Sequence, residues 1–581
     1  MSVNANYRGM PYLRAGISAC SVALLVSICF LAATPQTRAA DDSSKPSATP
    51  GQKIFVPPAR QVVLDDLRQA TPAQLAAHPA TLRPRDGLTD KQRRELKLEI
   101  EHRAAHGSAS PGSAPSKVKP PAAGAFVSFP GLNQEFACPG CTPSDMALAV
   151  SENFVVQIVN SAVNVYDKRG NAQSGYPKSI NDFFSLPANA FTTDPRAFYD
   201  WENHRFLIVM LLESDLHQSD NVGSLLIAAS QTHDPRLGWW TYNPAFQIGN
   251  TGECPDYPTL GHDSTNWGSG ATKGGFYVGI NQFDTPCGSL IQNYMFLIPK
   301  DAVYSGGGFG APTWSGFTDG PLVDTIQAAN ITGRGDKLGA VLMVNSFNIN
   351  FGGGQCRNGC NGLILWTITN PFASGSLSAT VIGTVNNYSL PPNAHEPGCT
   401  TFGCIETIDT RITGQVKYNA GSLWGSLDTD GSGGGAVGSH TLWFEVRPQT
   451  DANSNLTGAT ELQEDCFFCG GQGTNGSSFF GTIGADPEGN ATLVYNFSDD
   501  SSYPGTAYTS RRVDYCCLMN GAGFYLRNGD AFYGEGRWGD YTATAVDNTV
   551  ATSPAVWFSG MFAESDGDWG TYIGANQPFN P

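Results

Sequence analysis

The chain has 581 residues, with 34 lysines and arginines against 51 aspartates and glutamates, which gives a formal net charge of −17. This length is ample for a large core and for more than one domain, and the acidic balance argues against nucleic acid or an anionic membrane surface as the main partner. Its 67 glycines and 37 prolines, with aromatic residues at 11%, indicate short strands joined by tight turns rather than disorder.

The first residues have the features of an export signal. Arg8 and Arg14 form a cationic start, an apolar run follows from Ala15 to Ala33, and Ala39 ends a stretch with small residues where a signal peptidase reads. The rival interpretation is a retained membrane anchor, but the densest apolar run is short for a span of about 18 residues. The sequence therefore predicts a signal peptide at 1–39, no membrane span after its cleavage, and a secreted or periplasmic protein.

Cysteine usage fits this compartment. Of the 14 cysteines, Cys20 and Cys29 leave with the predicted signal. C-x-x-C spacing suits zinc in a reducing compartment, but thiols outside the cytoplasm usually become disulfides. We therefore predict disulfides, with local pairing favoured, although Cys466 and Cys469 are also able to join Cys516 and Cys517. The candidate local pairs are Cys138/Cys141, Cys356/Cys360, Cys399/Cys404, Cys466/Cys469 and Cys516/Cys517, with Cys254 and Cys287 further apart.

Three segments of differing composition precede the main domain. Residues 40–60 are rich in Ser, Pro, Lys and Ala and predict a flexible linker. Residues 61–106 have helical composition, and Leu96 and Ile100 lie four apart on one helix face. This helical segment is either a prosequence, an accessory cap or a solvated arm. Residues 107–125, rich in Pro, Ser and Gly, predict a second linker.

Residues 126–581 have strand and turn character throughout. Short apolar or alternating runs at 147–150, 154–159 and 162–166 are separated by turns, and similar units recur along the chain. Recurrence at intervals of about 40 to 70 residues is typical of the four-stranded blades of a propeller. The sequence therefore predicts an all-β fold, a β-propeller of six or seven blades, after a short helical N-terminal segment. A β-sandwich pair or a β-helix is the alternative, and the irregular period disfavours the β-helix.

Five aspartates begin or interrupt these strand units in similar contexts. If the blades repeat, these positions converge near the axis, where two carboxyls can act as acid and as base or nucleophile on a glycosidic bond. The alternative is turn chemistry, since Asp before Pro or Tyr often caps its own turn. The candidate residues are Asp145, Asp194, Asp256, Asp409 and Asp540.

Arginines and aromatic residues accompany these acids. Arg411 and Arg537 stand two or three residues from an Asp, and their planar donors suit the carboxylate of an acidic sugar. The alternative is a pair of Asp and Arg that holds blades together. Trp538 and Tyr541 are candidates for stacking on a sugar, although most aromatic residues in a propeller belong to the core.

One loop has spaced oxygens that suit a cation. Asp428 and Asp430 stand in Asp-Thr-Asp-Gly-Ser-Gly, which makes them candidate calcium ligands. The loop lacks the terminal Glu of a full calcium-binding loop, so a plain hairpin loop is favoured. No H-E-x-x-H, G-x-S-x-G or P-loop motif occurs, which weakens metalloprotease, α/β-hydrolase and nucleotide-dependent functions. The predicted chemistry requires no cofactor, and Ca²⁺ is the candidate ion.

A family resemblance rests on five segments: Pro143–Asp145, Thr193–Asp200, Pro255–Pro258, Thr407–Arg411 and Arg537–Tyr541. On these segments the chain resembles secreted bacterial β-propeller proteins, and it is distantly similar in architecture to sialidase-like propellers that act on glycans. The sialidase loop S-x-D-x-G-x-T-W is not met, which argues against a true sialidase. The resemblance implies an exported propeller that binds or cleaves extracellular polysaccharide or glycoconjugate at its central face, in the manner of a glycoside hydrolase if it is an enzyme. The alternative is a non-catalytic propeller that binds a protein or the cell surface.

Overall fold

The structure is a computed structural model that describes residues 46–71, 74, 90–106, 127–138, 141–188, 190–213, 221–285, 287–332, 337–347, 360–400, 403–430, 438–467, 476–513, 519, 523–549 and 555–576. Nearly all elements in these residues are β-strands, so the predicted all-β class is confirmed. The predicted signal peptide at 1–39 and the predicted linker at 107–125 lie outside the described residues.

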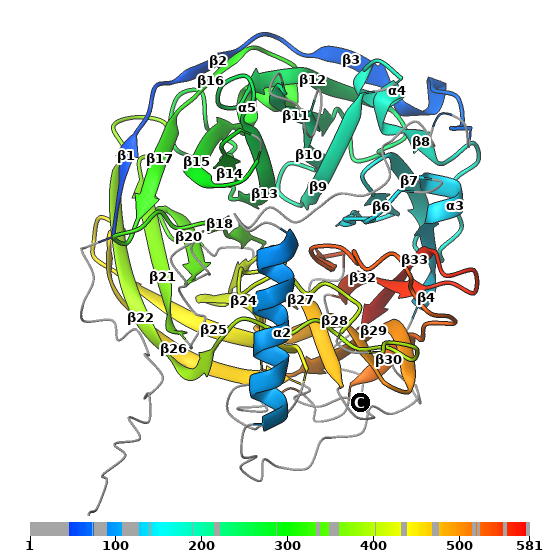
Figure 1. Cartoon of the computed structure of the whole chain (residues 1–581). Helices are drawn as coiled ribbons and strands as arrows, with labels where there is room; N and C mark the ends of the chain where they lie inside the picture. The colour runs from blue at the N-terminus through cyan, green and yellow to red at the C-terminus, as the bar shows by residue number, and fades with distance from the viewer. Residues whose placement is uncertain are drawn as a thin grey trace, which may run out of the picture. The chain divides into compact units, whose positions relative to one another are not determined.

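Antiparallel meanders follow one another along the chain (Figure 1). The predicted strand runs near residue 150 correspond to the first meander, which contains β5 (Ala147–Val150), β6 (Phe154–Ile158), β7 (Ala162–Asp167) and β8 (Lys178–Ser179). The next two contain β9 (Phe191–Asp200), β10 (Arg205–Glu213), β11 (Gly223–Ser230) and β12 (Gly238–Gln247), and then β13 (Cys254–His262), β14 (Gly275–Phe283), β15 (Leu290–Pro299) and β17 (Thr313–Thr318).

The second half of the chain continues this order. It contains β18 (Gln327–Ala328), β20 (Val341–Ser346), β21 (Cys360–Thr369) and β22 (Ser376–Tyr388), followed by β23 (Lys417–Asn419), β24 (Ser422–Thr429), β25 (His440–Thr450) and β26 (Leu456–Phe467). The last strands are β27 (Ser477–Ala485), β28 (Ala491–Asp499), β29 (Ser502–Arg511) and β30 (Phe524–Arg527), and then β31 (Ala543–Asp547), β32 (Ala555–Ala563) and β33 (Trp569–Asn576). Short β19 (Asn330–Ile331) lies between β13 and β23 and joins their meanders into one sheet.

The sheets are buried on both faces because each packs between two others. In β10, Leu207 and Val209 belong to the core shared with the β13 meander, whereas Ile208 and Met210 belong to the core shared with the β5 meander. Successive strand residues point to opposite faces, so an apolar run fills both cores. Each such buried side chain contributes about 1.5–3 kcal/mol relative to an exposed one.

The first strands of the meanders also contact one another in order. We use "first strands" for β5, β9, β13, β18, β23, β27 and β31. β5 contacts β9, β9 contacts β13, and β13 contacts β18 and its continuation β19. β19 contacts β23, β23 contacts β27, β27 contacts β31, and β31 returns to contact β5. The contacts between first strands are therefore cyclic.

The last sheet takes its outer strand from the beginning of the domain. β4 (Val127–Asn133) pairs antiparallel with β33, with Ser128 opposite Gly574. Trp557 and Ile573 of this sheet share a core with Val155 of β6. The two ends of the β-rich region are thus held together by main-chain hydrogen bonds and by a common core.

The N-terminal segments differ from the sequence prediction. Instead of a flexible linker at 40–60 and helix from residue 61, β1 (Ser47–Pro50) pairs with β17, β2 (Ile54–Val56) with β16 (Phe309–Ala311), and β3 (Arg60–Val63) with β12. Only a single 3₁₀ turn, Leu64–Asp66, follows before residue 71. An open sheet edge offers unpaired main-chain groups that any extended segment can bind, so pairing here needs no apolar pattern.

The predicted helix is present as α2 (Asp90–His106), and it is docked rather than free. Arg93, Lys97 and Ile100 are buried at spacings of four and three residues, which places them on one face. Ile100 packs against Leu390. Lys97 Nζ donates to Pro391 O at 2.6 Å, which anchors the helix on the segment before β23.

Disulfides are confirmed for three pairs, two of them local in sequence and one between the more distant Cys254 and Cys287. Cys138 is bonded to Cys141, Cys254 to Cys287, and Cys399 to Cys404. The remaining short helices are α3 (Gln134–Ala137), α4 (Ile180–Phe184) and α5 (Lys300–Ser305). Within the described part of the chain, the helices are all too short or too polar to cross a membrane.

Candidate functional site

A left-handed backbone conformation recurs at or before the first strand of each meander. We call this end of the first strands the N-terminal face. A non-glycine residue with positive φ costs about 1–3 kcal/mol, so it persists only where its surroundings fix it. The residues are Asp145 (φ 39°), Asp194 (55°), Tyr257 (51°), Thr325 (49°), Ile408 (53°), Phe480 (53°) and Gly539 (152°).

Side-chain oxygens hold several of these left-handed residues in place. In each case the backbone N–H of the left-handed residue donates to a carboxylate or amide oxygen of the preceding meander. These bonds therefore join consecutive sheets, and they give some of the predicted acids a structural role. The donor and acceptor pairs are Asp194 and Asn160 (2.9 Å), Tyr257 and Asp194 (3.1 Å), Thr325 and Asn281 (2.8 Å), and Phe480 and Asp428 (2.7 Å).

A buried cluster joins the last meander to the first. The backbone N–H of Asp540 donates to Asp145 Oδ1 at 3.2 Å, and Asn160 Nδ2 donates to Asp145 Oδ2 at 3.0 Å. Arg537 pairs with Asp540 through Nη2 and donates Nη1 to Gly539 O at 2.7 Å. The structure thus brings Asp145, Arg537 and Asp540 together at the N-terminal face.

Two buried carboxyl groups have a raised pKa: Asp145 at this face, and Glu396 beside Tyr533. Burial raises the pKa of Asp145 well above its usual value, and the charges of Asp540 and Asp194 raise it further. Burial also raises the pKa of Glu396 to about 7, although the backbone N–H of Tyr533, 2.9 Å from Glu396 Oε2, opposes the shift. A carboxylic acid that keeps its proton near neutral pH can donate it, which is the property of a general acid.

Asp409 and Arg411 form a second buried pair. Arg411 Nε donates to Asp409 Oδ1 at 2.9 Å and Nη2 donates to Oδ2 at 2.7 Å, a two-pronged contact. Burial alone would raise the pKa of Asp409, but the charge and hydrogen bonds of Arg411 outweigh it and hold that pKa below its usual value. The Arg411 guanidinium lies 4.7 Å from the ring centre of Tyr257, which ties this pair to the first strand β13.

Trp538 and Tyr541 are core side chains here, which differs from the predicted stacking on sugar. Trp538 is 1% exposed and packs against Tyr533 and Phe479, with ring centres 4.8 and 6.2 Å away. One face of Tyr541 is covered by the Arg196 guanidinium at 3.4 Å. The close contact of first strands fills this region with side chains, and only tertiary packing decides that.

The predicted calcium ligands occupy different surroundings. Asp428 is fully buried, and its oxygens accept hydrogen bonds from the Phe480 backbone N–H and from Thr441 Oγ1 at 3.2 Å. Asp430 lies beyond the end of β24, where its backbone N–H donates to Ser389 O. Calcium binding by Asp428 and Asp430 therefore stays a prediction.

The described residues form one other group with metal-ligand chemistry. It consists of Glu396, Cys399 and Cys404. The two sulfurs are bonded to each other, so they are not available as thiolate ligands.

Asp256 lies in β13 beside Tyr257, across from Asn281 of β14, with its side chain partly exposed. Sequence reasoning did not single out Asp324. This acid stands directly before the left-handed Thr325, just as Asp256 stands directly before the left-handed Tyr257. The feature of the sequence that could have identified Asp324 is its position directly before the strand run at 327–331. Nothing local in the sequence marks Glu396, because its raised pKa follows from burial by distant segments.

Comparison with known proteins does not assign this chain to a family. No protein-family model matches the chain, and no curated protein matches it. Among solved structures it is similar to an ulvan lyase, a polysaccharide lyase, at 9% identity over 78% of this chain and 96% of that one, with a TM-score of 0.37. An exo-β-1,3-galactanase from Phanerochaete chrysosporium gives 9% identity over 61% and 78%, with a TM-score of 0.29. A protein of unknown function from Dyadobacter fermentans gives 11% over 67% and 95%, with a TM-score of 0.30. These TM-scores are too low for the matches to carry an argument about fold or activity.

Proposed function

We propose that the chain is an exported, seven-bladed β-propeller that binds or cleaves an extracellular polysaccharide or glycoconjugate at the N-terminal face. The cyclic contacts of the first strands in the described residues support the propeller and its blade number. The left-handed residue that recurs at the N-terminal face in every meander supports the same repeat. The disulfides support an oxidising compartment, since such bonds persist outside the cytoplasm.

One observation carries the functional part of the proposal: carboxyl groups of opposite protonation preference occur at the same face. Asp145 favours its protonated form, whereas Arg411 keeps Asp409 ionised. Hydrolysis of a glycosidic bond needs such a division, with one acid to protonate the leaving oxygen and one carboxylate to act as base or nucleophile. In this assignment Asp145 is the acid, Asp409 or Asp540 is the base or nucleophile, and Arg537 binds acidic groups of the substrate.

The proposal requires that α2 moves away from the N-terminal face. Asp145 and Asp409 are only 1% and 2% exposed, so a sugar does not reach them in this arrangement. Lys97 of α2 donates to Thr407 Oγ1 at 3.2 Å, two residues before Asp409. The positive charge of Lys97 also lowers the pKa of Asp409. We assign α2 the role of a cap over the site.

A second candidate is a non-catalytic binding module. It is favoured by the hydrogen bonds of the acids, because Asp145, Asp194 and Asp428 all accept bonds that join one sheet to another. In this version the acids only hold the propeller together, and loops at the same face bind the glycan or a protein surface.

A glycan panel with a displaced cap tests the proposal. Ile100→Asp places a charge in the contact with Leu390 and should release α2, whereas Lys91→Ala alters an α2 side chain that is 84% exposed and serves as the matched control. If docking of α2 stabilises the closed arrangement by about 1.4 kcal/mol, it lowers glycan binding about tenfold. We therefore expect Ile100→Asp to increase glycan binding or turnover at least about tenfold. Hydrogen exchange of the α2 amides verifies the displacement.

The acids are then tested in the released background. Asp540→Asn should lower turnover about 10²–10⁴-fold, the contribution of a positioned acid or base. Binding without turnover would favour the non-catalytic module. If α2 is released and neither acidic nor neutral glycans are bound, the proposed function is wrong.

A further inference from the structure

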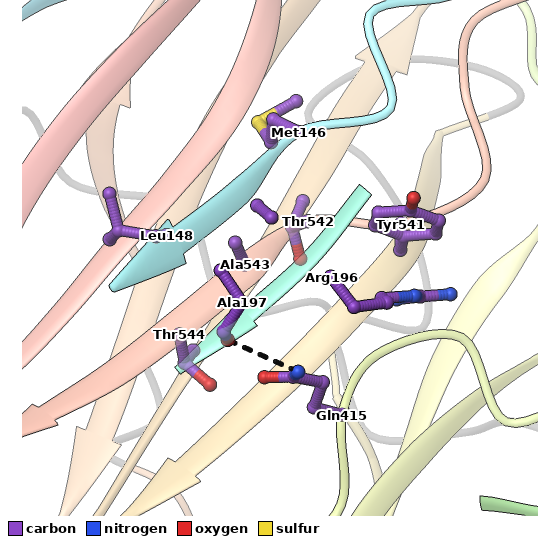
Figure 2. A pocket seen from close by; sticks show the side chains of 10 residues that line it. Met146, Leu148, Arg196, Ala197, Gln415, Tyr541, Thr542, Ala543 and Thr544 are labelled. Atoms are coloured by element: carbon purple, nitrogen blue, oxygen red, sulfur yellow. Dashed lines mark hydrogen bonds between the residues drawn. The ribbon is translucent and has the colours of Figure 1, made fainter. Parts of the chain in front are cut away.

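The cavity lined by Arg196, Gln415 and Tyr541 at the first strands is too small for an organic substrate. It leaves room for about one water-sized particle (Figure 2). It therefore offers no reaction site. The loop between β22 and β23 does offer one, because it carries a partly exposed disulfide beside a carboxyl group that the proposed glycan site does not use.

A tight turn places Cys399 beside Glu396. Pro397 suits the second position of a type II turn, and Gly398 supplies the positive φ, 105°, that the third position requires. The backbone N–H of Cys399 closes the turn by donating to Glu396 O at 3.1 Å. The motif Glu-Pro-Gly-Cys thus brings a carboxyl group and a sulfur together through local backbone preference.

The second sulfur comes from the returning side of the same loop. Ala394 and Ile405 exchange both backbone hydrogen bonds, at 2.9 and 3.1 Å, which brings Cys404 back to the turn. Cys399 is bonded to Cys404, and a carboxylate oxygen of Glu396 lies within 4.8 Å of both sulfurs. In the part of the chain that the structure describes, this is the one disulfide with a carboxyl group so close to both sulfurs.

The Cys399–Cys404 disulfide is also accessible. Both cysteines are partly exposed, and the neighbouring Gly398 is exposed. By contrast, Cys138 and Cys141 are only 1% and 5% exposed. Thiol–disulfide exchange requires a thiolate to reach one of the two sulfurs, so exposure favours reaction at the Cys399–Cys404 pair.

The Glu396 carboxyl group can supply a proton to these sulfurs. Its Oε1 is buried without a hydrogen-bond partner, and its Oε2 accepts from the Tyr533 backbone N–H at 2.9 Å. Burial raises the pKa of Glu396 to about 7, so close to neutral pH the group both holds and releases a proton. The distance to the sulfurs allows transfer through one bridging water.

The titratable groups around the loop pair with one another or with solvent rather than with Glu396. The burial of Glu396 and the Tyr533 N–H therefore set its proton affinity. Glu535, on the same segment as Tyr533, is exposed. The neighbouring pairs are His395 with Asp500, at 3.4 Å, and Glu406 with Lys97, at 3.5 Å.

We propose that the Cys399–Cys404 disulfide is a site of thiol–disulfide exchange, and that Glu396 gives a proton to the sulfur that leaves. A thiolate of a second molecule bonds to one cysteine sulfur, the S–S bond breaks, and the other cysteine takes the proton. Glu396 regains a proton from solvent, where the attacking thiol released one. A second thiol then attacks the mixed disulfide, so two electrons and two protons pass to the protein and a new disulfide is released.

Exchange is measured on the full chain with glutathione, by quenching with an alkylating reagent and mapping the modified cysteines by mass spectrometry. We expect the Cys399–Cys404 pair to react at least about tenfold faster than Cys138–Cys141 or Cys254–Cys287, because both of its sulfurs are accessible. The rate constant per glutathione thiolate should fall as pH rises through about 7, because Glu396 then loses its proton.

A matched pair of variants isolates the proton. Glu396→Gln keeps an oxygen that can accept from the Tyr533 N–H, and it should slow exchange about tenfold or more below pH 7 and remove the fall near pH 7. Glu535→Gln removes an exposed carboxylate from the segment of Tyr533 and should retain the wild-type rate and pH profile. The wild-type pH profile tests the role of Glu396 even if Glu396→Gln folds poorly.

Two probes distinguish the source of the thiol. Glutathione represents a small thiol, a short peptide with two cysteines represents a protein dithiol, and reduction by either supports the proposal. The faster probe identifies the class of partner. Reaction of Cys254–Cys287 before Cys399–Cys404, a rate per thiolate that is constant through pH 7, or an unchanged rate in Glu396→Gln would overturn it. The proposal is independent of any action on glycans.

Discussion

Asp428 offers a sharp test of how burial sets the stability of this protein. Burial raises the pKa of Asp428 from its ordinary value to about 7, against the opposing effect of the Phe480 N–H and the Thr441 hydroxyl. The folded protein therefore holds this proton more tightly than the unfolded chain does. The stabilising contribution is complete below about pH 4 and is lost as pH rises through about 7. A shift of about three pKa units corresponds to about 4 kcal/mol.

Asp428→Asn removes the titration and keeps the shape. The amide oxygen can still accept from the Phe480 N–H, 2.7 Å from the present carboxyl oxygen, and the amide nitrogen can donate to Thr441 Oγ1. Between pH 5 and pH 8 the wild-type protein should lose about 2.5 kcal/mol of unfolding free energy through Asp428, while the variant loses none of it. The variant should therefore gain about 2.5 kcal/mol relative to wild type over that interval.

Urea unfolding at pH 5, 6.5 and 8, at constant ionic strength, measures this difference. Glu202→Gln is the control, because it removes one carboxylate from an exposed turn residue. The control and wild-type curves should stay parallel. If Asp428→Asn also runs parallel to wild type, the carboxyl is ionised in the folded protein at pH 5 and the reasoning from burial is refuted.

Three further predictions concern the buried pairs. Asp409→Asn leaves the Arg411 charge buried without its carboxylate and should cost about 3–5 kcal/mol in urea unfolding; a loss below about 1 kcal/mol would mean that the pair is solvated. Replacing both Cys254 and Cys287 by Ala opens a loop of 33 residues and should cost about 3–4 kcal/mol, whereas an unchanged unfolding midpoint would show that the loop is already constrained. Tyr541→Phe should lower the unfolding free energy by about 1 kcal/mol, because it removes the hydrogen bond to Pro195 O. Tyr541→Leu should lower it by about 2 kcal/mol more, because it also removes the ring stacked on the Arg196 guanidinium. Equal losses for the two variants would exclude a contribution from that stacking.

Local sequence patterns predicted much of the β-structure. The runs at 147–150 and 162–166 became β5 and β7, because their apolar residues suit a strand buried on both faces. The close spacing of Cys138 and Cys141 likewise predicted a local disulfide. Asp540 was predicted from its place before a strand run, and Asp540 does meet Asp145 at the N-terminal face.

The misses arose where long-range contacts decide the outcome. Residues 47–63 pair with distant edge strands through main-chain hydrogen bonds, which leave no signature in side-chain pattern. The sequence also left open whether α2 is a free arm, since its docking depends on Lys97 reaching a carbonyl at residue 391. Trp538 was predicted as a sugar platform because its residue type suits one, and its burial follows from rings on other segments.

The sequence by itself determined an all-β chain, with paired cysteines and acids placed at the starts of strand units, because these features depend on neighbouring residues. The tertiary structure alone decided which polar groups are buried together. It set the raised pKa of Asp145, the ionised pair of Asp409 and Arg411, and the unpartnered donor of Arg196. Asp145 meets Asp540 from 395 residues further along the chain, whereas Asp409 and Arg411 are neighbours in sequence that other segments bury. A carboxyl or guanidinium takes its chemistry from such surroundings.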